Sequence, residues 1–157
     1  MRYSETLSFG RDVATVLKMF VDPNYRVEKF EKLGFSDIKT LAQNTNGNKF
    51  SIKLQYGTKP SIQLPSFAQK FVSGTMVVEQ EDIWHTDSKT GELNVEVKGM
   101  PTKIQAKMKL VETSTGCNLV LDWDVNVKIP LIGSKLEAVL VDDMKSKSGT
   151  DHQTSVA

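Results

Sequence analysis

Gln80 and Asp82 are the polar side chains whose type and spacing best suit chemistry inside the protein. They lie two residues apart in a segment with strand-like alternation, so an unbroken strand would place both on the inner face with Val78 and Trp84. A buried amide and a buried carboxylate need hydrogen-bond partners, and together they could orient a bound ligand as a polar anchor. A β-bulge near Glu79 would instead turn both toward solvent, and we favour the bulge.

The histidines and the cysteine form no recognisable catalytic or metal site. His85 lies beside a turn at the end of a strand-like segment and His152 lies near the C-terminus, so we predict that both are solvated. Cys117 has no evident histidine or cationic partner and is predicted to be inert. The sequence has no H-x-x-x-H, C-x-x-C or G-x-G-x-x-G pattern, so we expect no metal, no cofactor and no nucleotide.

The paired carboxylates also fail to make an acid and base couple. Asp142 and Asp143 are adjacent in a predicted helix, which separates them by about 100° around its axis. Asp122 and Asp124 do share a face of a predicted strand, but it is the outer face, where lysines are near. We therefore predict no catalytic residue.

The composition is that of an ordinary globular domain. Of 157 residues, 39% are hydrophobic and 25% charged, which is enough apolar material for one core, so we predict a single domain over residues 1–157. A net charge of +1 without runs of like charge argues against a nucleic acid or a charged membrane surface as partner. No stretch reaches the roughly 18 apolar residues of a membrane span, and the N-terminus alternates, so we expect the cytoplasm as the compartment.

The N-terminal third predicts one strand and two short helices. Inward-facing residues alternate from Tyr3 to Phe9, which is the period-two pattern of a strand. Asp12 is a suitable N-cap for a first helix, and Asp22 followed by Pro23 is a suitable start for a second. Gly34 is expected to end that second helix.

Most of the remaining chain predicts antiparallel strands joined by hairpin turns. The turn N-T-N-G-N at 44–48 is the strongest, because Asn and Gly tolerate positive φ. A loop and a single helical turn at Ser66–Val72 are expected ahead of the strand that contains Gln80. Period-two alternation covers residues 35–44, 50–56, 74–85, 93–97, 104–110 and 119–129.

The last predicted element is an amphipathic helix. Ser134 and Glu137 have the S-x-x-E spacing of a capping box at its start. The apolar stripe continues to Met144, and we expect helix to about Lys147 with a frayed tail from about residue 148, where Ser, Gly and Thr lower the helix propensity. The order of elements predicts an α+β fold in which a curved seven-stranded antiparallel sheet wraps around this helix.

This chain resembles the START-like superfamily, also called SRPBCC, which includes the birch pollen allergen and lipid-transfer START domains. Within it, the chain is most similar to an uncharacterised bacterial family. The features that carry the resemblance are Asp22-Pro23 and its helix, the strand ending at Trp84, the break at Gly99-Met100-Pro101, and the run P-L-I-G-S-K-L-E at 130–137. The resemblance implies a helix-grip fold with a cavity that takes apolar ligands, and enzymes as a minority of members.

The inner face of the sheet and the stripe of the last helix supply the predicted ligand-binding residues. From the residues alone a solid core is favoured, since most inward strand residues fill space, whereas the resemblance favours a hollow one. The predicted set is Phe50, Leu54, Tyr56, Val78, Gln80, Asp82, Trp84, Leu93, Val95, Val97, Met108, Leu121, Trp123, Leu140 and Met144.

Three functions follow as hypotheses. The first is non-catalytic binding or carriage of a small hydrophobic ligand such as a lipid or polyketide. The second is a protein interaction module, which would show an exposed apolar patch and no pocket. The third is a cyclase or dehydratase, which would need at least two of Asp82, Gln80, Tyr56 and His85 to meet in one cavity.

Overall fold

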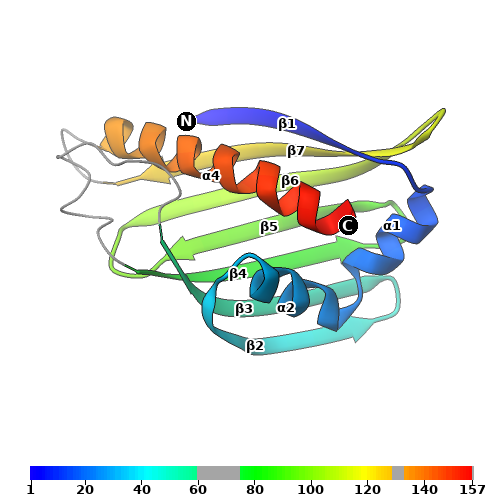
Figure 1. The fold of residues 1–157 in the computed structure, drawn as a ribbon, viewed down its shortest axis with the longest axis horizontal. Coiled ribbons are helices and arrows are strands. Elements are labelled where there is room, and N and C mark those ends of the chain that lie inside the picture. Colours follow the sequence, from blue (N-terminus) through cyan, green and yellow to red (C-terminus); the bar gives the residue numbers. More distant parts are fainter. Residues whose placement is uncertain (60–74, 129–132, 157) are drawn as a thin grey trace.

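The computed structural model describes residues 1–59, 75–128 and 133–156, with side chains as far as residue 145. Its described strands form one antiparallel sheet in the order β1-β7-β6-β5-β4-β3-β2, so that β1 and β2 are the edges. The predicted helical turn at Ser66–Val72 lies outside the described residues. The elements are β1 Arg2–Phe9, α1 Val13–Phe20, α2 Pro23–Lys32, β2 Ser36–Asn46, β3 Lys49–Thr58, β4 Met76–His85, β5 Thr90–Val97, β6 Thr102–Thr113, β7 Gly116–Val127 and α4 Gly133–Val156 (Figure 1).

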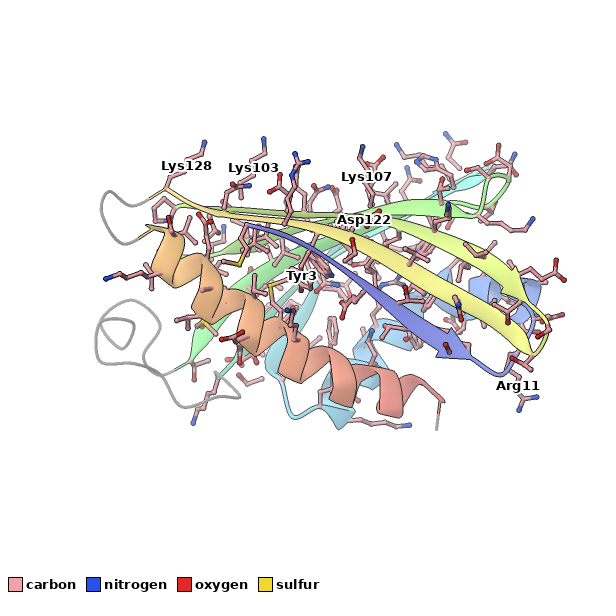
Figure 2. All side chains as sticks on the ribbon, turned by 90° about the horizontal axis from the view of Figure 1, so that it is seen from above. Tyr3, Arg11, Lys103, Lys107, Asp122 and Lys128 are labelled. Carbon is pink, nitrogen blue, oxygen red and sulfur yellow. The ribbon has the colours of Figure 1, made fainter. Side chains whose placement is uncertain are left out.

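One face of the sheet is covered by the helices. Figure 1 shows α4 crossing this face, with α1 and α2 near the C-terminal end of α4. Helix α2 contacts both α4 and β2. Figure 2 shows Tyr3 between the sheet and α4, while Lys103, Lys107, Asp122 and Lys128 extend from the opposite, outer face. The α+β fold predicted from the order of elements is confirmed, and so is the helix-grip arrangement that the resemblance implies.

The two short helices begin and end where their capping residues predict. The side chain of Asp12 accepts from the backbone N–H of Thr15 at 3.0 Å, and that of Asp22 accepts from Asn24 at 2.9 Å, with Pro23 in the first turn. These bonds satisfy amide groups that have no partner within the helix. Gly34 follows α2 with φ of +80°, a conformation that favours glycine.

Strand β4 has no bulge, so the bulge expected near Glu79 is wrong. Its pairing with β3 runs without a break from Met76 to His85, and its pairing with β5 is equally regular. Gln80 and Asp82 therefore face the helices, together with Trp84. The reason is that both polar groups have buried hydrogen-bond partners, so facing inward leaves neither of them unsatisfied.

Both ends of α4 differ from the prediction. The helix already includes Gly133, so Ser134 is inside it, and Glu137 does not close a capping box. Glu137 instead accepts from the backbone N–H of Val127 at 3.1 Å and from the terminal ammonium of Met1 at 3.0 Å. At the other end the helix continues past Lys147 to Val156, because propensity is a weak preference and no proline interrupts this segment.

Candidate functional site

A cavity of about 210 Å³ lies between the sheet and α4. Every predicted ligand-binding residue except Phe50 and Leu54 lines it; those two are buried elsewhere in the core. The inner face is therefore partly hollow, although inward strand residues alone favoured a solid core. Whether these residues bind a ligand stays a prediction. The predicted residues in the wall are Tyr56, Val78, Gln80, Asp82, Trp84, Leu93, Val95, Val97, Met108, Leu121, Trp123, Leu140 and Met144.

One side of the cavity holds a chain of hydrogen bonds from α2 to β3. Arg26 donates from Nε to Oδ2 of Asp82 at 2.7 Å, and Gln80 donates from Nε2 to Oδ1 of the same carboxylate at 2.9 Å. Tyr56 donates from its hydroxyl to Oε1 of Gln80 at 3.0 Å. Because the carboxylate only accepts, it fixes which end of the Gln80 amide faces Tyr56.

Arg26 is the largest feature of the site that the sequence analysis missed. It is 2% exposed, and besides Asp82 it bonds the carbonyl oxygen of Phe20 at the end of α1. The ring centroids of Tyr25 and Phe50 each lie 5.7 Å from its guanidinium carbon. A signal was present, since Arg26 precedes Phe30 by four residues and so lies on the buried stripe of α2.

A second polar group lies on the opposite side, on β1 and β7. Trp123 donates from its indole N–H to Oε1 of Glu5 at 3.0 Å, and its ring stacks on Tyr3 with centroids 6.1 Å apart. Within the described part of the chain, the hydroxyl of Tyr3 is buried and has no hydrogen-bond partner. Burial, with a smaller contribution from the charge of Glu5, raises the pKa of Tyr3. Glu5 and Tyr3 were predicted to face inward but were not predicted as site residues.

Aromatic rings make up much of the wall near α1 and α2. Phe20 stacks on Trp84 with centroids 5.3 Å apart and planes 9° apart, and Phe35 stacks on Tyr56 at 4.8 Å and 5°. Phe30 lies 4.7 Å from Tyr56, centroid to centroid. Such contacts hold the rings in fixed orientations, so this part of the wall is shaped before any ligand enters.

Of the remaining groups that the sequence analysis considered for chemistry, Asp143 lines the cavity and His85, Cys117 and Asp142 do not. His85 and Cys117 are absent from its lining, and Cys117 is fully buried, which raises the pKa of its thiol. Asp143 is buried and lines the cavity, whereas Asp142 is exposed. Among the described residues, no group of three or more His, Cys, Asp or Glu side chains could hold a metal ion.

Comparison with known families matches residues 4–154 to the family described as "Protein of unknown function (DUF2505)". The chain belongs to this family. Among curated proteins, none matches the sequence. None of the described helices of this DUF2505 protein is both long and apolar enough to span a membrane.

Solved structures with the same fold include Ara h 8.0201, an aromatase/cyclase and a START superfamily protein. Ara h 8.0201 is 12% identical with a TM-score of 0.65, and 99% of this chain covers 95% of that one. The Zhui aromatase/cyclase from Streptomyces sp. R1128 is 8% identical with a TM-score of 0.66, and the match covers 99% of this chain and 90% of the aromatase/cyclase chain. A START superfamily protein from Mycobacterium smegmatis is 14% identical with a TM-score of 0.60, and the match covers 94% of this chain and 92% of that one. At these identities the likeness establishes the START-like fold of the DUF2505 chain.

Proposed function

We propose that this DUF2505 protein binds a small hydrophobic molecule in the cavity between its sheet and α4, without transforming it. The observation that carries the proposal is the cavity itself, about 210 Å³ in volume and walled mainly by aliphatic and aromatic side chains. Well-packed cores contain few voids larger than a water molecule, so a space of this size is not ordinary packing. A ligand would bury its apolar surface there.

The size of the cavity limits the ligand. An apolar cavity of about 150 Å³ is large enough for benzene, and pockets for drug-sized ligands begin near 300 Å³. The observed volume of about 210 Å³ lies between these values. It suits a molecule of one or two rings, or a short acyl chain, better than a diacyl lipid.

Native mass spectrometry of the purified protein tests the proposal, followed by denaturation and organic extraction of whatever was bound. We expect either a co-purified small apolar molecule in stoichiometric amount or an apo protein whose Tm rises with one- and two-ring aromatic compounds. An apo mass together with no Tm change across such compounds and short-chain lipids would contradict it.

A cyclase or dehydratase activity is the second candidate, because three of its four possible polar participants meet in the cavity wall. Tyr56, Gln80 and Asp82 are joined by hydrogen bonds, whereas His85 is elsewhere. Both carboxylate oxygens of Asp82 already accept hydrogen bonds, one of them within an ion pair, which disfavours Asp82 as a general base. Turnover of a bound polyketide, abolished by Asp82→Asn, would favour the enzyme over the carrier.

The interaction module has less support. The exposed large apolar residues of the described chain are Met1, which precedes β1, and Leu41, Val77 and Val111, which lie on β2, β4 and β6. Among the described residues, these side chains do not supply the continuous apolar patch that a protein partner would require.

We keep the cytoplasm as the proposed compartment, since the single cysteine, Cys117, is a buried free thiol.

A further inference from the structure

Two polar side-chain atoms in the cavity wall are buried without a partner. Within the described residues, the hydroxyl of Tyr3 and the indole N–H of Trp84 have no hydrogen-bond partner, and both side chains line the cavity. A hydroxyl can donate or accept, so Tyr3 does not decide which kind of group would satisfy it. An indole N–H only donates, so Trp84 requires an acceptor.

The edge of the Trp84 ring is the part of it that can face the cavity. One face of the ring stacks on Phe20 of α1, with centroids 5.3 Å apart and planes 9° apart. The other face lies against the sheet at Gly91, the partner of Trp84 on β5, where a Cβ would stand 3.0 Å from Cδ2 of the indole. Because Cδ2 is bonded to three other ring atoms, so close an approach comes through the face of the ring. Both faces are therefore covered, and the N–H lies on the edge between them.

No acceptor of the described chain bonds this N–H. Asp82 lies two residues earlier on the same face of β4, but its two oxygens accept from Arg26 and Gln80. Trp84 is 1% exposed, so bulk water does not satisfy the donor either. A buried donor without an acceptor is costly, and a ligand that supplies one recovers that free energy on binding.

The wall beside Trp84 can adjust to a ligand. Met108 is the partner of Gly91 on β6 and also lines the cavity, with its Cε 3.1 Å from the position that a Cβ at Gly91 would take. Methionine has three rotatable side-chain bonds and adapts to irregular spaces. A ligand that displaces Met108 therefore brings its acceptor to the indole edge.

We infer that the cavity selects a small apolar ligand that carries a neutral acceptor oxygen, a ketone carbonyl, which accepts from the indole N–H of Trp84. The inference rests on the proposed ligand-binding function and narrows its ligand class. An ionised carboxylate also accepts hydrogen bonds, but taking its charge out of water costs far more than one neutral donor returns. Small ketones are therefore favoured over fatty acids.

The test uses three bicyclic probes of nearly the same shape, titrated calorimetrically at pH 7. Indane has no polar atom, 1-indanone has a carbonyl that only accepts, and indole has an N–H that only donates. The carbonyl also loses hydrogen bonds to water on binding, so the informative quantity is the affinity of 1-indanone relative to that of indane in each protein.

Trp84→Phe removes the donor from the wall. The smaller ring changes the shape of the cavity for all three probes, and this contribution cancels in the ratio of two affinities. We expect the affinity of 1-indanone relative to indane to fall by at least about tenfold, which corresponds to about 1.4 kcal/mol. The affinity of indole relative to indane should stay within about threefold of the wild-type ratio.

Nuclear magnetic resonance of the indole protons gives a second readout that needs no substitution of Trp84. The chain has two tryptophans, and the N–H of Trp123 already donates to Glu5, so it is the internal reference. Trp123→Phe assigns the two signals. We expect 1-indanone to move the Trp84 proton downfield of its position in the indane complex, because a proton is deshielded when it enters a hydrogen bond. The Trp123 proton should have nearly the same position in both complexes.

These results separate the inference from the proposed function. Binding of all three probes with ratios that Trp84→Phe leaves unchanged, or a Trp84 proton at one position in both complexes, would overturn the inference and leave the proposed function in place. An equal fall for indole would also overturn it, because indole offers no acceptor atom to the N–H. Failure of all three probes to bind would overturn both.

Discussion

Arg26 of α2 and Asp82 of β4 form an ion pair with 2.7 Å between Nε and Oδ2, and both residues are buried. Since Arg26 also bonds the carbonyl oxygen of Phe20, one side chain joins α1, α2 and the centre of the sheet. Asp82 in turn holds Gln80, which holds Tyr56. The pair therefore fixes both the position of α2 and the polar side of the cavity.

Removing one partner of this pair is predicted to be strongly destabilising. Arg26→Met leaves Asp82 buried without its cation, and we expect the free energy of unfolding to fall by about 3–5 kcal/mol, measured by urea denaturation. A change below about 1 kcal/mol would contradict the assignment, since surface ion pairs contribute no more than that.

The double variant Arg26→Met/Asp82→Leu is the control for this prediction. It removes both charges, so no unpaired ion is left in the interior, and we expect it to recover a large part of the stability lost by Arg26→Met alone. If the double variant is less stable than the single one, the loss arises from packing around α2 instead of from the unpaired carboxylate.

The free energy of unfolding should respond differently to loss of the hydroxyl at the two tyrosines in the cavity wall. Tyr56→Phe breaks the bond to Gln80 and is expected to cost about 1 kcal/mol. Tyr3→Phe removes a hydroxyl that lacks a partner within the described residues, so the apo protein should be equally or more stable. Chemical denaturation of both variants checks this, and equal losses would show that the hydroxyl of Tyr3 is satisfied in solution.

The stability of the protein should depend on pH through Glu137. Burial opposes the ionised form, but hydrogen bonds from Val127 and from the terminal ammonium outweigh it and lower the pKa of this carboxyl. A lowered folded-state pKa gives stability that is complete above the unfolded value of about 4.3 and is lost as the pH falls through the folded value.

Melting curves between pH 3 and 7 test this dependence. We expect Glu137→Gln to have a flatter profile of Tm against pH than the wild type in the acid range, and Glu92→Gln to keep the wild-type slope. Parallel profiles for wild type and Glu137→Gln would contradict the role of Glu137.

Both tryptophans of the chain line the cavity, so they should report its occupation. Iodobenzene quenches indole emission on contact and has one ring, which the cavity volume allows. We expect saturable quenching of the protein at concentrations where free N-acetyltryptophanamide shows only weak, linear quenching. Identical linear quenching of both samples would mean that the molecule does not enter.

The sequence predicted the architecture well because its signals are local and repeated. Alternation along each strand, Asp12 and Asp22 as N-caps, and Gly34 after α2 each point to the element that forms. Both ends of α4 were predicted less well. Ser, Gly and Thr did not lower the helix propensity enough to end the helix near Lys147. Glu137 was assigned to a capping box, but it bonds Val127, ten residues earlier, and Met1, 136 residues earlier.

The polar parts of the site were harder to predict because each depends on a partner far away in sequence. Without a known partner, Gln80 and Asp82 favour a bulge that turns them toward solvent. The partner that allows Asp82 to face inward is Arg26, which lies 56 residues earlier in the chain. Glu5 likewise has Trp123 as a partner from the other end of the chain. Periodicity gives the face on which a residue lies, but it does not give the neighbour that makes burial of a charge tolerable.

The central claim, that the space under α4 receives a small hydrophobic ligand, is tested most directly by filling it. Val95→Phe adds a ring to the cavity wall, and Val111→Phe makes the same change at an exposed position of β6. Calorimetric titration with naphthalene should give wild-type affinity for Val111→Phe and at least about tenfold weaker binding for Val95→Phe, with Tm unchanged or raised. Equal affinity in all three proteins, or no binding by the wild type, would contradict the claim.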